Sequence, residues 1–472
     1  MRGKWWILAG VACGTFMATL DSSIVNIALP TLTQELSSDL VRIKWVVIVY
    51  LLVITCLLLP WGRLADQYGR RRVFQLGFAL FTGGSLACGM SASLGWLLLS
   101  RALQGIGASM LMANGPAIIT AAFPSRERGK ALGTLSMVVS AGLVTGPASG
   151  GFLISHWGWR SIFLVNIPVG ILGFFLTRKF IPVDPPRKVS LPFDWAGTLL
   201  QFLFFLSMIV VVDPPSISIS GGDAISAPRF LMIPLTLLLG WLFIRVESQI
   251  KAPLFDLSLL KNRTFWSANL ASFLIFVSFS AVTVLMPFYL VELLMLDPSQ
   301  AGLFMTAIPL TILVVAPISG RLSDRIGGRE LSMVGAAVGA ISLLIMAGAF
   351  GTGLDLSSTS TLLIGTLAGL GFSTGLFQSP NNNAIMGVVP PSKLGVASAL
   401  LATVRNLGLV TGTGLATGIF FWRKQEEGDF VSALHFALAV AGCVAAVAAV
   451  ISALKPSGRY EGGAESDGQA KG

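Results

Sequence analysis

The sequence predicts an all-α polytopic membrane protein, in which two parallel six-helix repeats flank two inserted central helices. Three observations support this fold class: composition, the number of long apolar stretches, and an internal repeat. The 472 residues are 54% hydrophobic and only 11% charged, whereas soluble proteins carry about 25% charge. A chain this long and this poor in charge cannot hide its apolar surface in one water-soluble core, so its main solvent is expected to be lipid.

Fourteen apolar stretches approach the length of about 20 residues that a helix needs to cross the hydrocarbon of a bilayer. A Pro-, Gly- and Ser-rich segment separates the seventh stretch from the eighth. The expected spans are residues 5–29, 43–62, 73–91, 95–122, 130–153, 161–180, 195–212, 229–246, 266–290, 302–320, 331–350, 361–388, 395–420 and 431–454.

The distribution of basic residues predicts the orientation of these spans. With the N-terminus inside, only six of the 32 Lys and Arg residues fall on outer segments, and Arg101 and Arg405 fall within spans. This positive-inside bias predicts that both termini are cytoplasmic, and a bacterial cytoplasmic (inner) membrane is the expected location. The net charge of +10 is scattered between apolar runs, which argues against a nucleic-acid partner. The polar tail, residues 456–472, is expected to be disordered.

Several segments of the first half recur in the second half. GLVTG occurs at 142–146 and again at 408–412. GRLADQYGRR, which begins at Gly62, corresponds to GRLSDRIGGR, which begins at Gly320, and Pro30 corresponds to Pro287. The offset is 257 or 258 residues early in each half and 266 later, and chance matches among glycine-rich helices would not keep the same order at such similar offsets. Parallel repeats of this kind are typical of transporters with a substrate site between the halves. The expected division is 1–185 and 263–455 for the two six-helix bundles, with 186–262 for the inserted helices.

Here the motifs resemble a known family. GRLADQYGRRR, RALQGIGA on span four and GLVTGPASGG on span five resemble the loop, arginine and antiporter motifs of the major facilitator superfamily. LDSSIVNIALP and WRSIFLVNIPVG resemble its 14-span drug:proton antiporters, the EmrB/QacA type. The resemblance implies efflux of hydrophobic small molecules or drugs in exchange for protons, by alternating access, without ATP or any other cofactor.

The loop motif contains Gly62, Asp66, Gly69, Arg70 and Arg71. The glycines are expected to let the backbone turn, and the arginines can pair with carboxylates or hold the loop at an anionic membrane surface. The resemblance implies a cytoplasmic latch, and simple positive-inside anchoring is the alternative. The second copy, with Ser323, Asp324 and Gly328, is degenerate, and a weaker latch is expected there.

The antiporter motif contains Gly142, Gly146, Pro147, Gly150 and Gly151. Glycines four residues apart share one helix face and permit close helix approach, and the proline bends the helix. A sealing contact between the halves is expected, with ordinary tight packing as the alternative. Because the second GLVTG lacks the proline and the Gly-Gly pair, only the first copy is expected to be bent and closely packed. By resemblance, the motif marks exporters.

Asp21 is the one clearly intramembrane acid of the expected spans. A carboxylate in a span costs about 2.5–3.5 kcal/mol and indicates function. Asp21 and Arg101 lie about 12 Å and 10 Å below the outer ends of their spans, so they can meet as a buried pair. We expect Asp21 to exchange a proton for substrate, with Arg101 controlling how readily it does so. A static structural ion pair is the alternative.

Further polar residues in the spans are candidates for lining the substrate cavity. Amides at such positions either face water or hydrogen-bond neighbouring helices. Arg405 has no evident acidic partner and is expected to face an anionic substrate or Asp21. A cavity of this composition suits neutral or anionic compounds. The candidates are Asn26, Gln104, Asn114, Gln378, Asn381, Asn382, Arg405 and Asn406.

Other functions and partners follow from what the spans contain. Export of one specific metabolite, siderophore or lipid is an alternative, and a non-transporting sensor or scaffold is another. No HExxH, P-loop or nucleophile–base pair stands in a span, so neither an enzyme nor a metal site is expected. The four cysteines are expected to be buried hydrophobes. The protein is expected to be a monomer whose partners are membrane lipids, protons and a small hydrophobic substrate. Whether it also works with a periplasmic adaptor protein and an outer-membrane channel is left undecided by the sequence.

Overall fold

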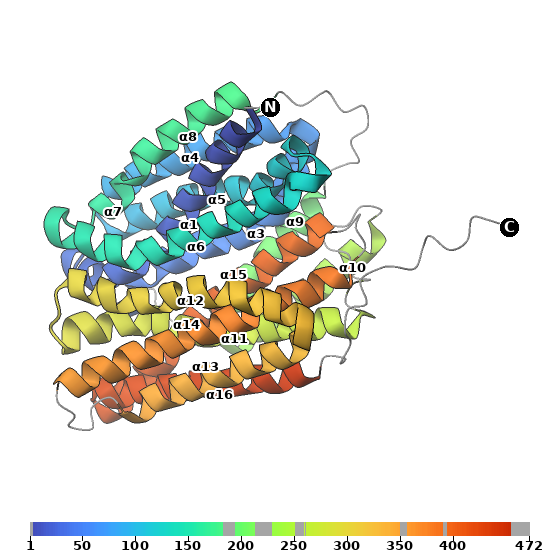
Figure 1. Cartoon of the computed structure of the whole chain (residues 1–472). Helices are drawn as coiled ribbons and strands as arrows, with labels where there is room; N and C mark the ends of the chain where they lie inside the picture. Colours follow the sequence, from blue (N-terminus) through green and yellow to red (C-terminus); the bar gives the residue numbers. More distant parts are fainter. Residues whose placement is uncertain are drawn as a thin grey trace.

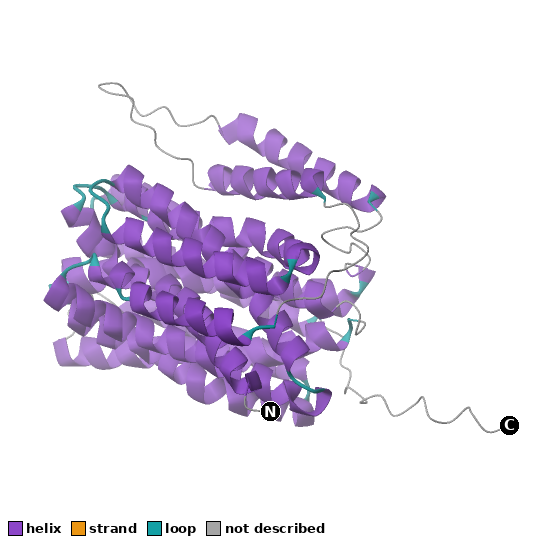
Figure 2. Ribbon diagram, turned by 90° about the horizontal axis from the view of Figure 1, so that it is seen from above, coloured by secondary structure: helices purple, strands orange, loops and turns teal. Residues whose placement is uncertain are grey.

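The computed structural model of the chain consists of helices packed side by side (Figures 1 and 2), with no strand in the ranges it describes. These ranges are residues 3–182, 194–212, 229–250, 259, 261–349, 356–389 and 394–454. The expected disordered tail and the segment between spans seven and eight lie outside the described residues.

Fourteen helices of the described ranges are fifteen residues or longer, as many as the expected spans. Short helices α2 (Leu40–Ile43) and α7 (Ser161–Leu164) precede α3 and α8, and a π-helical turn, η2 (Tyr289–Leu293), follows α11. The long helices are α1 (Gly3–Glu35), α3 (Trp45–Tyr68), α4 (Arg70–Gly89), α5 (Leu94–Ala122), α6 (Ser125–Trp157), α8 (Asn166–Phe180), α9 (Trp195–Val212), α10 (Arg229–Gln249), α11 (Arg263–Phe288), α12 (Pro298–Ile326), α13 (Gly328–Ala349), α14 (Leu356–Gly387), α15 (Leu394–Glu427) and α16 (Phe430–Ala453).

Eleven of these segments are long and apolar enough to cross a membrane by length and composition, and α4, α10 and α15 fall outside that set. Large apolar side chains such as Leu99 and Leu237, 73% and 69% exposed, lie on the outer surface, which suits contact with lipid. The predicted all-α membrane fold is therefore confirmed. Cys56 and Cys88 are buried as expected and Cys13 is half-buried, but Cys443 is exposed on α16, so the expectation is wrong for Cys443.

The helices pair in the same way in both halves of the chain. α1 packs on α6 as α11 packs on α15, and α4 packs on α5 as α13 packs on α14. Figure 1 shows the first half above the second, with α6 and α12 side by side where the halves meet. The inserted α9 and α10 pack on each other, and α9 also contacts α3 of the first half and α15 of the second.

Gly69 forms the whole connection between α3 and α4. Its φ of 101° lies in the left-handed region, which side chains disfavour, and Gly327 repeats this turn between α12 and α13 with a φ of 97°. Gly62, which the sequence suggested as a second turn residue, instead lies inside α3, and no neighbour stands where its Cβ would be. The turn prediction is therefore wrong for Gly62 and missed Gly327. We call this end of the bundle, at which α1 also begins, the loop-motif end, and the opposite end the far end.

Both GLVTG copies pack closely against the first helix of their own half. A Cβ on Gly142 or Gly146 would collide with Thr19 or Ser23 of α1. A Cβ on Gly412 would collide with Ser280 and the Val277 carbonyl of α11. The expectation that only the first copy is closely packed is wrong, because the repeated motif makes the same helix pair in each half.

Candidate functional site

Asp21 lies on α1 in the middle of the first half and is fully buried, at 0% exposure. Its Oδ2 accepts a hydrogen bond from Arg101 Nη1 at 2.5 Å. Its Oδ1 accepts one from Gln104 Nε2 at 2.8 Å and one from Asn166 Nδ2 at 3.2 Å. The carboxylate thus joins α1, α5 and α8, and the predicted meeting of Asp21 with Arg101 is confirmed as a buried ion pair.

Arg101, which is 1% exposed, is held in place by groups other than the carboxylate. Its Nη1 also donates to Gln104 Oε1 at 2.6 Å, and its Nε donates to the Val46 carbonyl of α3 at 3.0 Å. Its guanidinium lies 3.9 Å from the centre of the Tyr50 ring, close enough for a cation–π interaction. The cation therefore keeps three partners if the carboxylate changes its charge.

Sequence reasoning missed most of the groups around this pair. Gln104, expected at the substrate cavity, is instead enclosed in the first half, where its Nε2 also donates to Ser85 Oγ at 2.8 Å. Asn166 carried a signal, since it stands in WRSIFLVNIPVG, one of the segments that resemble drug:proton antiporters. Tyr50 and Ser85 had none, because neither a lone tyrosine nor a lone serine in a span indicates a contact.

The charge of Asp21 decides which contacts this group of side chains can make. A proton on Asp21 would remove the negative charge that faces Arg101 and would turn one acceptor oxygen into a donor. The ion pair would weaken, and α1 would be freer to move relative to α5. A fixed buried pair is also compatible with these contacts, and breaking such a pair by losing one charge costs several kcal/mol. The arrangement thus links the charge of Asp21 to helix packing.

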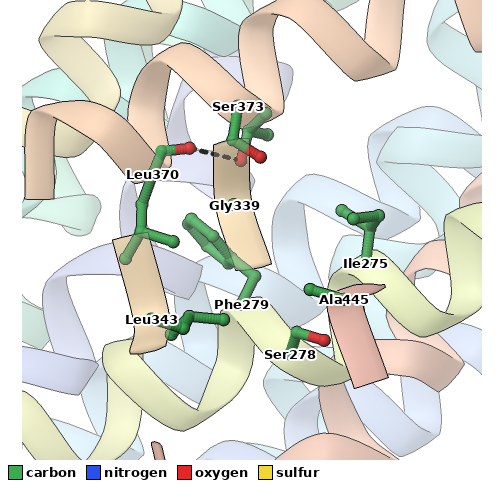
Figure 3. Close-up of a pocket in the computed structure, with 9 residues that line it drawn as sticks. Ile275, Ser278, Phe279, Gly339, Leu343, Leu370, Ser373 and Ala445 are labelled. Atoms are coloured by element: carbon green, nitrogen blue, oxygen red, sulfur yellow. Dashed lines mark hydrogen bonds between the residues drawn. The ribbon is translucent and has the colours of Figure 1, made fainter. Parts of the chain in front are cut away.

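The second half contains a small cavity at the position equivalent to this site. If Pro30 corresponds to Pro287, Asp21 corresponds to Ser278, and the same repeat pairs Gln104 with Leu370 and Ser85 with Leu343. All three counterparts line a cavity of about 10 Å³ between α11, α13, α14 and α16 (Figure 3). Thr374, which also lines the cavity, donates from its hydroxyl to the Leu370 carbonyl at 2.9 Å. The volume suits about one water molecule.

The remaining cavity candidates divide by burial. Asn114 and Asn406 are enclosed, and Asn381 donates to the Ala268 carbonyl of α11 at 3.1 Å, as a residue that joins helices does. Four candidates are half-buried and keep the cavity assignment as a prediction: Asn26, Gln378, Asn382 and Arg405. In the described ranges, the Arg405 side chain makes no hydrogen bond or ion pair with the protein.

The loop motif contacts the helices of its own half. Arg70 pairs with Asp66 at 2.8 Å and donates from Nη1 to the Ala117 carbonyl of α5 at 3.1 Å. Arg71 donates to the Arg178 carbonyl at the end of α8, at 2.6 Å. Arg71 thus covers a carbonyl in the last turn of α8, which has no partner within the helix, and the helix dipoles favour both arginines near the C-terminal ends of α5 and α8. The latch role stays a prediction.

The two halves touch closely at the far end. Ser155 of α6 donates to Asp297 Oδ2 at 2.7 Å and accepts from the Ser299 backbone at 3.2 Å. Gly151 and Gly302 lie so close to the facing backbone that a Cβ on either would collide with it. The antiporter motif therefore makes both expected contacts: its first glycines pack within the half, and its last one packs between the halves.

A buried lysine adds a second contact at the far end. Lys44, which is 1% exposed at the start of α3, donates to the Thr417 hydroxyl of α15 at 3.0 Å. In the part of the chain that is described, no group of three or more His, Cys, Asp or Glu side chains could hold a metal ion.

The comparisons with known proteins agree on one family. The family model that matches the chain is described as Major Facilitator Superfamily, and it matches residues 11–413 and 268–469. The riboflavin transporter RibZ of Clostridioides difficile (strain 630) is 39% identical over 421 residues, which are 89% of each chain. The multidrug resistance protein Stp of Mycobacterium tuberculosis (strain CDC 1551 / Oshkosh) is 31% identical over 414 residues, 87% of this chain and 75% of Stp.

Two solved structures share the fold at low sequence identity. The POT family transporter PepTSo superimposes with a TM-score of 0.71 and 14% identity, covering 96% of this chain and 97% of that one. A bacterial homologue of the human lysosomal transporter Spinster, in an inward-facing and unoccupied conformation, gives 0.67 and 16% with the same coverage.

Proposed function

Because this chain belongs to the Major Facilitator Superfamily, a family of transporters and not of enzymes, we propose that it is a proton-coupled exporter of hydrophobic organic molecules. It would work in the bacterial cytoplasmic membrane with both termini inside. The buried contact of Asp21 with Arg101, Gln104 and Asn166 carries the proposal. A carboxylate enclosed at this depth is costly and suits a residue that gains and loses a proton.

The helix contacts suggest how the proton would be coupled to movement. α1 carries Asp21 on one side and packs on α6 through Gly142 and Gly146 on another. α6 in turn meets α12 of the second half at the far end, through Gly151. A proton on Asp21 loosens α1 from α5, and this change reaches the closure between the halves through two tightly packed helix pairs.

The proposed direction of transport and the proposed class of substrate are based on similarity to known proteins. The GLVTGPASGG segment resembles an antiporter motif that marks exporters. Relatives named for multidrug resistance (Stp) and for methyl viologen resistance (SmvA of Salmonella typhimurium) are 31% and 29% identical to this chain. These names favour organic compounds as cargo over ions or sugars.

Transport of riboflavin or a similar heterocycle is a second candidate. The relative with this printed function is 39% identical over 89% of both chains. Arg405, half-buried and without a protein partner in the described ranges, could donate hydrogen bonds to the carbonyl oxygens of such a ring. The two candidates differ in substrate range and share the site at Asp21.

Uptake into inverted vesicles under an imposed pH gradient tests the proposal. A panel of cationic and neutral dyes and riboflavin is offered with and without an uncoupler. We expect uptake that collapses with the uncoupler, that is lost in Asp21→Asn, and that survives in Asp39→Asn. Asp39 is an exposed carboxylate that caps α2, a role that asparagine also fills. Undiminished gradient-driven uptake in Asp21→Asn contradicts the assignment of Asp21, and riboflavin as the only compound carried favours the second candidate.

A further inference from the structure

The first part of α11 presents apolar side chains that its own half does not cover. Trp266 and Leu270 are 38% and 39% exposed, and Phe273 is half-buried. These three residues stand at positions i, i+4 and i+7, so they share one side of the helix, and we call them the α11 stripe. Ile275, nine residues after Trp266, lines the small cavity between α11, α13, α14 and α16. Nine residues are about two and a half turns, so the stripe points away from the interior of the second half.

The α11 stripe lies on the side of the first half, whose helix α1 contacts α11. The close contacts between the halves, at Ser155, Gly151 and Lys44, are at the far end. The stripe instead lies near the start of α11, at the loop-motif end. Apolar side chains that stay exposed between two halves of a protein are available to a bound molecule.

Arg405 of α15 lies beside the α11 stripe. Gly408 of α15 packs on the Phe273 carbonyl of α11. One turn later Gly412 packs on Val277, so the two helices run parallel. Arg405 lies seven residues, about two turns, before Gly412 and therefore faces the same side, next to the start of α11. It lies about 16 Å from the start of α15 and is half-buried.

The charge of Arg405 is not compensated within the part of the chain that the structure describes. None of the described residues forms a hydrogen bond or an ion pair with its side chain. Asp21, the acid that the sequence suggested as a partner, is fully buried and is bonded to Arg101 and Gln104. A cation at such a depth is costly unless a counter-charge or water compensates it. An anionic molecule bound beside the stripe would supply that charge.

Asn269 adds an independent sign that a molecule binds at this contact. It lies seven residues before Phe276, which packs on Gly408 of α15, so it is on the side of α11 that meets α15. Asn269 is 7% exposed, and its Oδ1 is buried without a hydrogen-bond partner among the described residues. A buried amide oxygen that lacks a donor is expected to bond water or a ligand.

We propose that Arg405 and the α11 stripe form the cargo site, and that the cargo is an aromatic or otherwise apolar organic molecule with a single acid group, such as a carboxylate or a sulfonate. The planar guanidinium offers paired donors to the oxygens of such a group. Trp266 and Phe273 offer faces against which an aromatic body can stack. This inference rests on the proposed function, because it names the class of molecule that the exporter carries.

Equilibrium dialysis of the purified full chain in lipid nanodiscs tests the preference for a negative charge. The two probes are anilinonaphthalene sulfonate, an aromatic anion, and phenylnaphthylamine, the same aromatic body without the sulfonate. Empty nanodiscs correct for probe that dissolves in lipid. We expect the native protein to bind the anion more tightly than the neutral probe. Arg405→Gln should weaken binding of the anion by roughly 10–100-fold, as loss of a hydrogen bond to a charged group does, and leave the neutral probe unchanged.

Three further variants separate the charge from the apolar contact and from folding. Arg405→Lys keeps the positive charge and should lose less affinity for the anion than Arg405→Gln. Leu270→Ala removes apolar contact and should weaken both probes together, by roughly 3–10-fold. Arg42→Gln changes an exposed arginine at the far end and should change neither affinity.

Equal weakening of both probes in Arg405→Gln shows that the arginine has a structural role only. An unchanged affinity for the anion in that variant, or no binding of the anion to the native protein, shows that Arg405 holds no acid group. Each of these results overturns the proposal. Because dialysis requires neither a gradient nor transport, selective binding of the anion without gradient-driven uptake would support this site and contradict the exporter function.

Discussion

The Asp21–Arg101 pair makes a sharp prediction about stability, because its two members cannot be removed at equal cost. Asp21→Asn leaves a guanidinium at 1% exposure without its counter-charge, and arginine cannot release its proton. Removing one partner of a buried pair costs about 3–5 kcal/mol. Arg101→Gln leaves a carboxyl group whose charge a proton can cancel, so this variant should lose less stability than Asp21→Asn.

Thermal unfolding in detergent, followed with a thiol-reactive fluorophore, measures this difference. Cys56 and Cys88 are fully buried at 0% exposure and react on unfolding, whereas Cys443 is exposed and gives a constant background. At 2–4 °C for each kcal/mol, Asp21→Asn should lower the midpoint by roughly 6–20 °C. The double variant Asp21→Asn/Arg101→Gln should unfold at a higher temperature than Asp21→Asn alone. A midpoint of Asp21→Asn within about 2 °C of the native protein, or losses that simply add in the double variant, refutes charge compensation at this pair.

Three further predictions concern glycines and the far-end contact. Gly146→Val, whose side chain would occupy the place of Ser23, should prevent stable folding in an expression and gel-filtration assay, whereas Gly133→Val, with open space at its Cβ, should fold normally. Gly69→Ala should lower the free energy of unfolding by about 1–2 kcal/mol, measured by thermal unfolding, because its φ of 101° disfavours a side chain. Gly62→Ala, inside α3, should be neutral or stabilising. Equal effects of the two substitutions would contradict the turn assignment. Ser155→Ala should raise the labelling rate of a cysteine placed at the far end by roughly 2–10-fold, because a hydrogen bond between the halves contributes about 0.5–1.5 kcal/mol. An unchanged rate shows that this bond does not keep the two halves together at the far end.

Composition and the internal repeat were enough to predict most of the fold. Apolar length predicted the spans because a membrane helix satisfies its own backbone, which leaves composition as the main constraint. Helix ends were less predictable: α1 runs to Glu35 and α15 to Glu427, six and seven residues beyond the expected spans, since hydropathy does not register a helix that continues past the hydrocarbon. Gly62 failed as a turn residue for the same reason, because α3 continues past it to Tyr68.

The site was predictable where a charge marked it and not elsewhere. Asp21 and Arg101 stood out because charges in spans are costly, and their depths alone placed them together. Gln104 was expected at the cavity, yet it bonds both members of the pair. An amide in a span can hydrogen-bond either water or a charged side chain, and its position in the sequence does not distinguish the two. The same ambiguity hid Asn166.

The comparison of the two halves separates what the fold requires from what the chemistry requires. Small residues at the α1–α6 and α11–α15 contacts recur because both halves need the same close packing. The donors that stabilise Asp21 do not recur: its counterpart is Ser278, and the counterpart of Gln104 is Leu370. A carboxylate at Ser278 would lack the amide that Gln104 supplies to Asp21. Packing is thus shared between the halves, whereas among the described residues the buried carboxylate with its arginine belongs to the first half. If Asp21 exchanges a proton as proposed, the charge of this one residue would bias one bundle against the other.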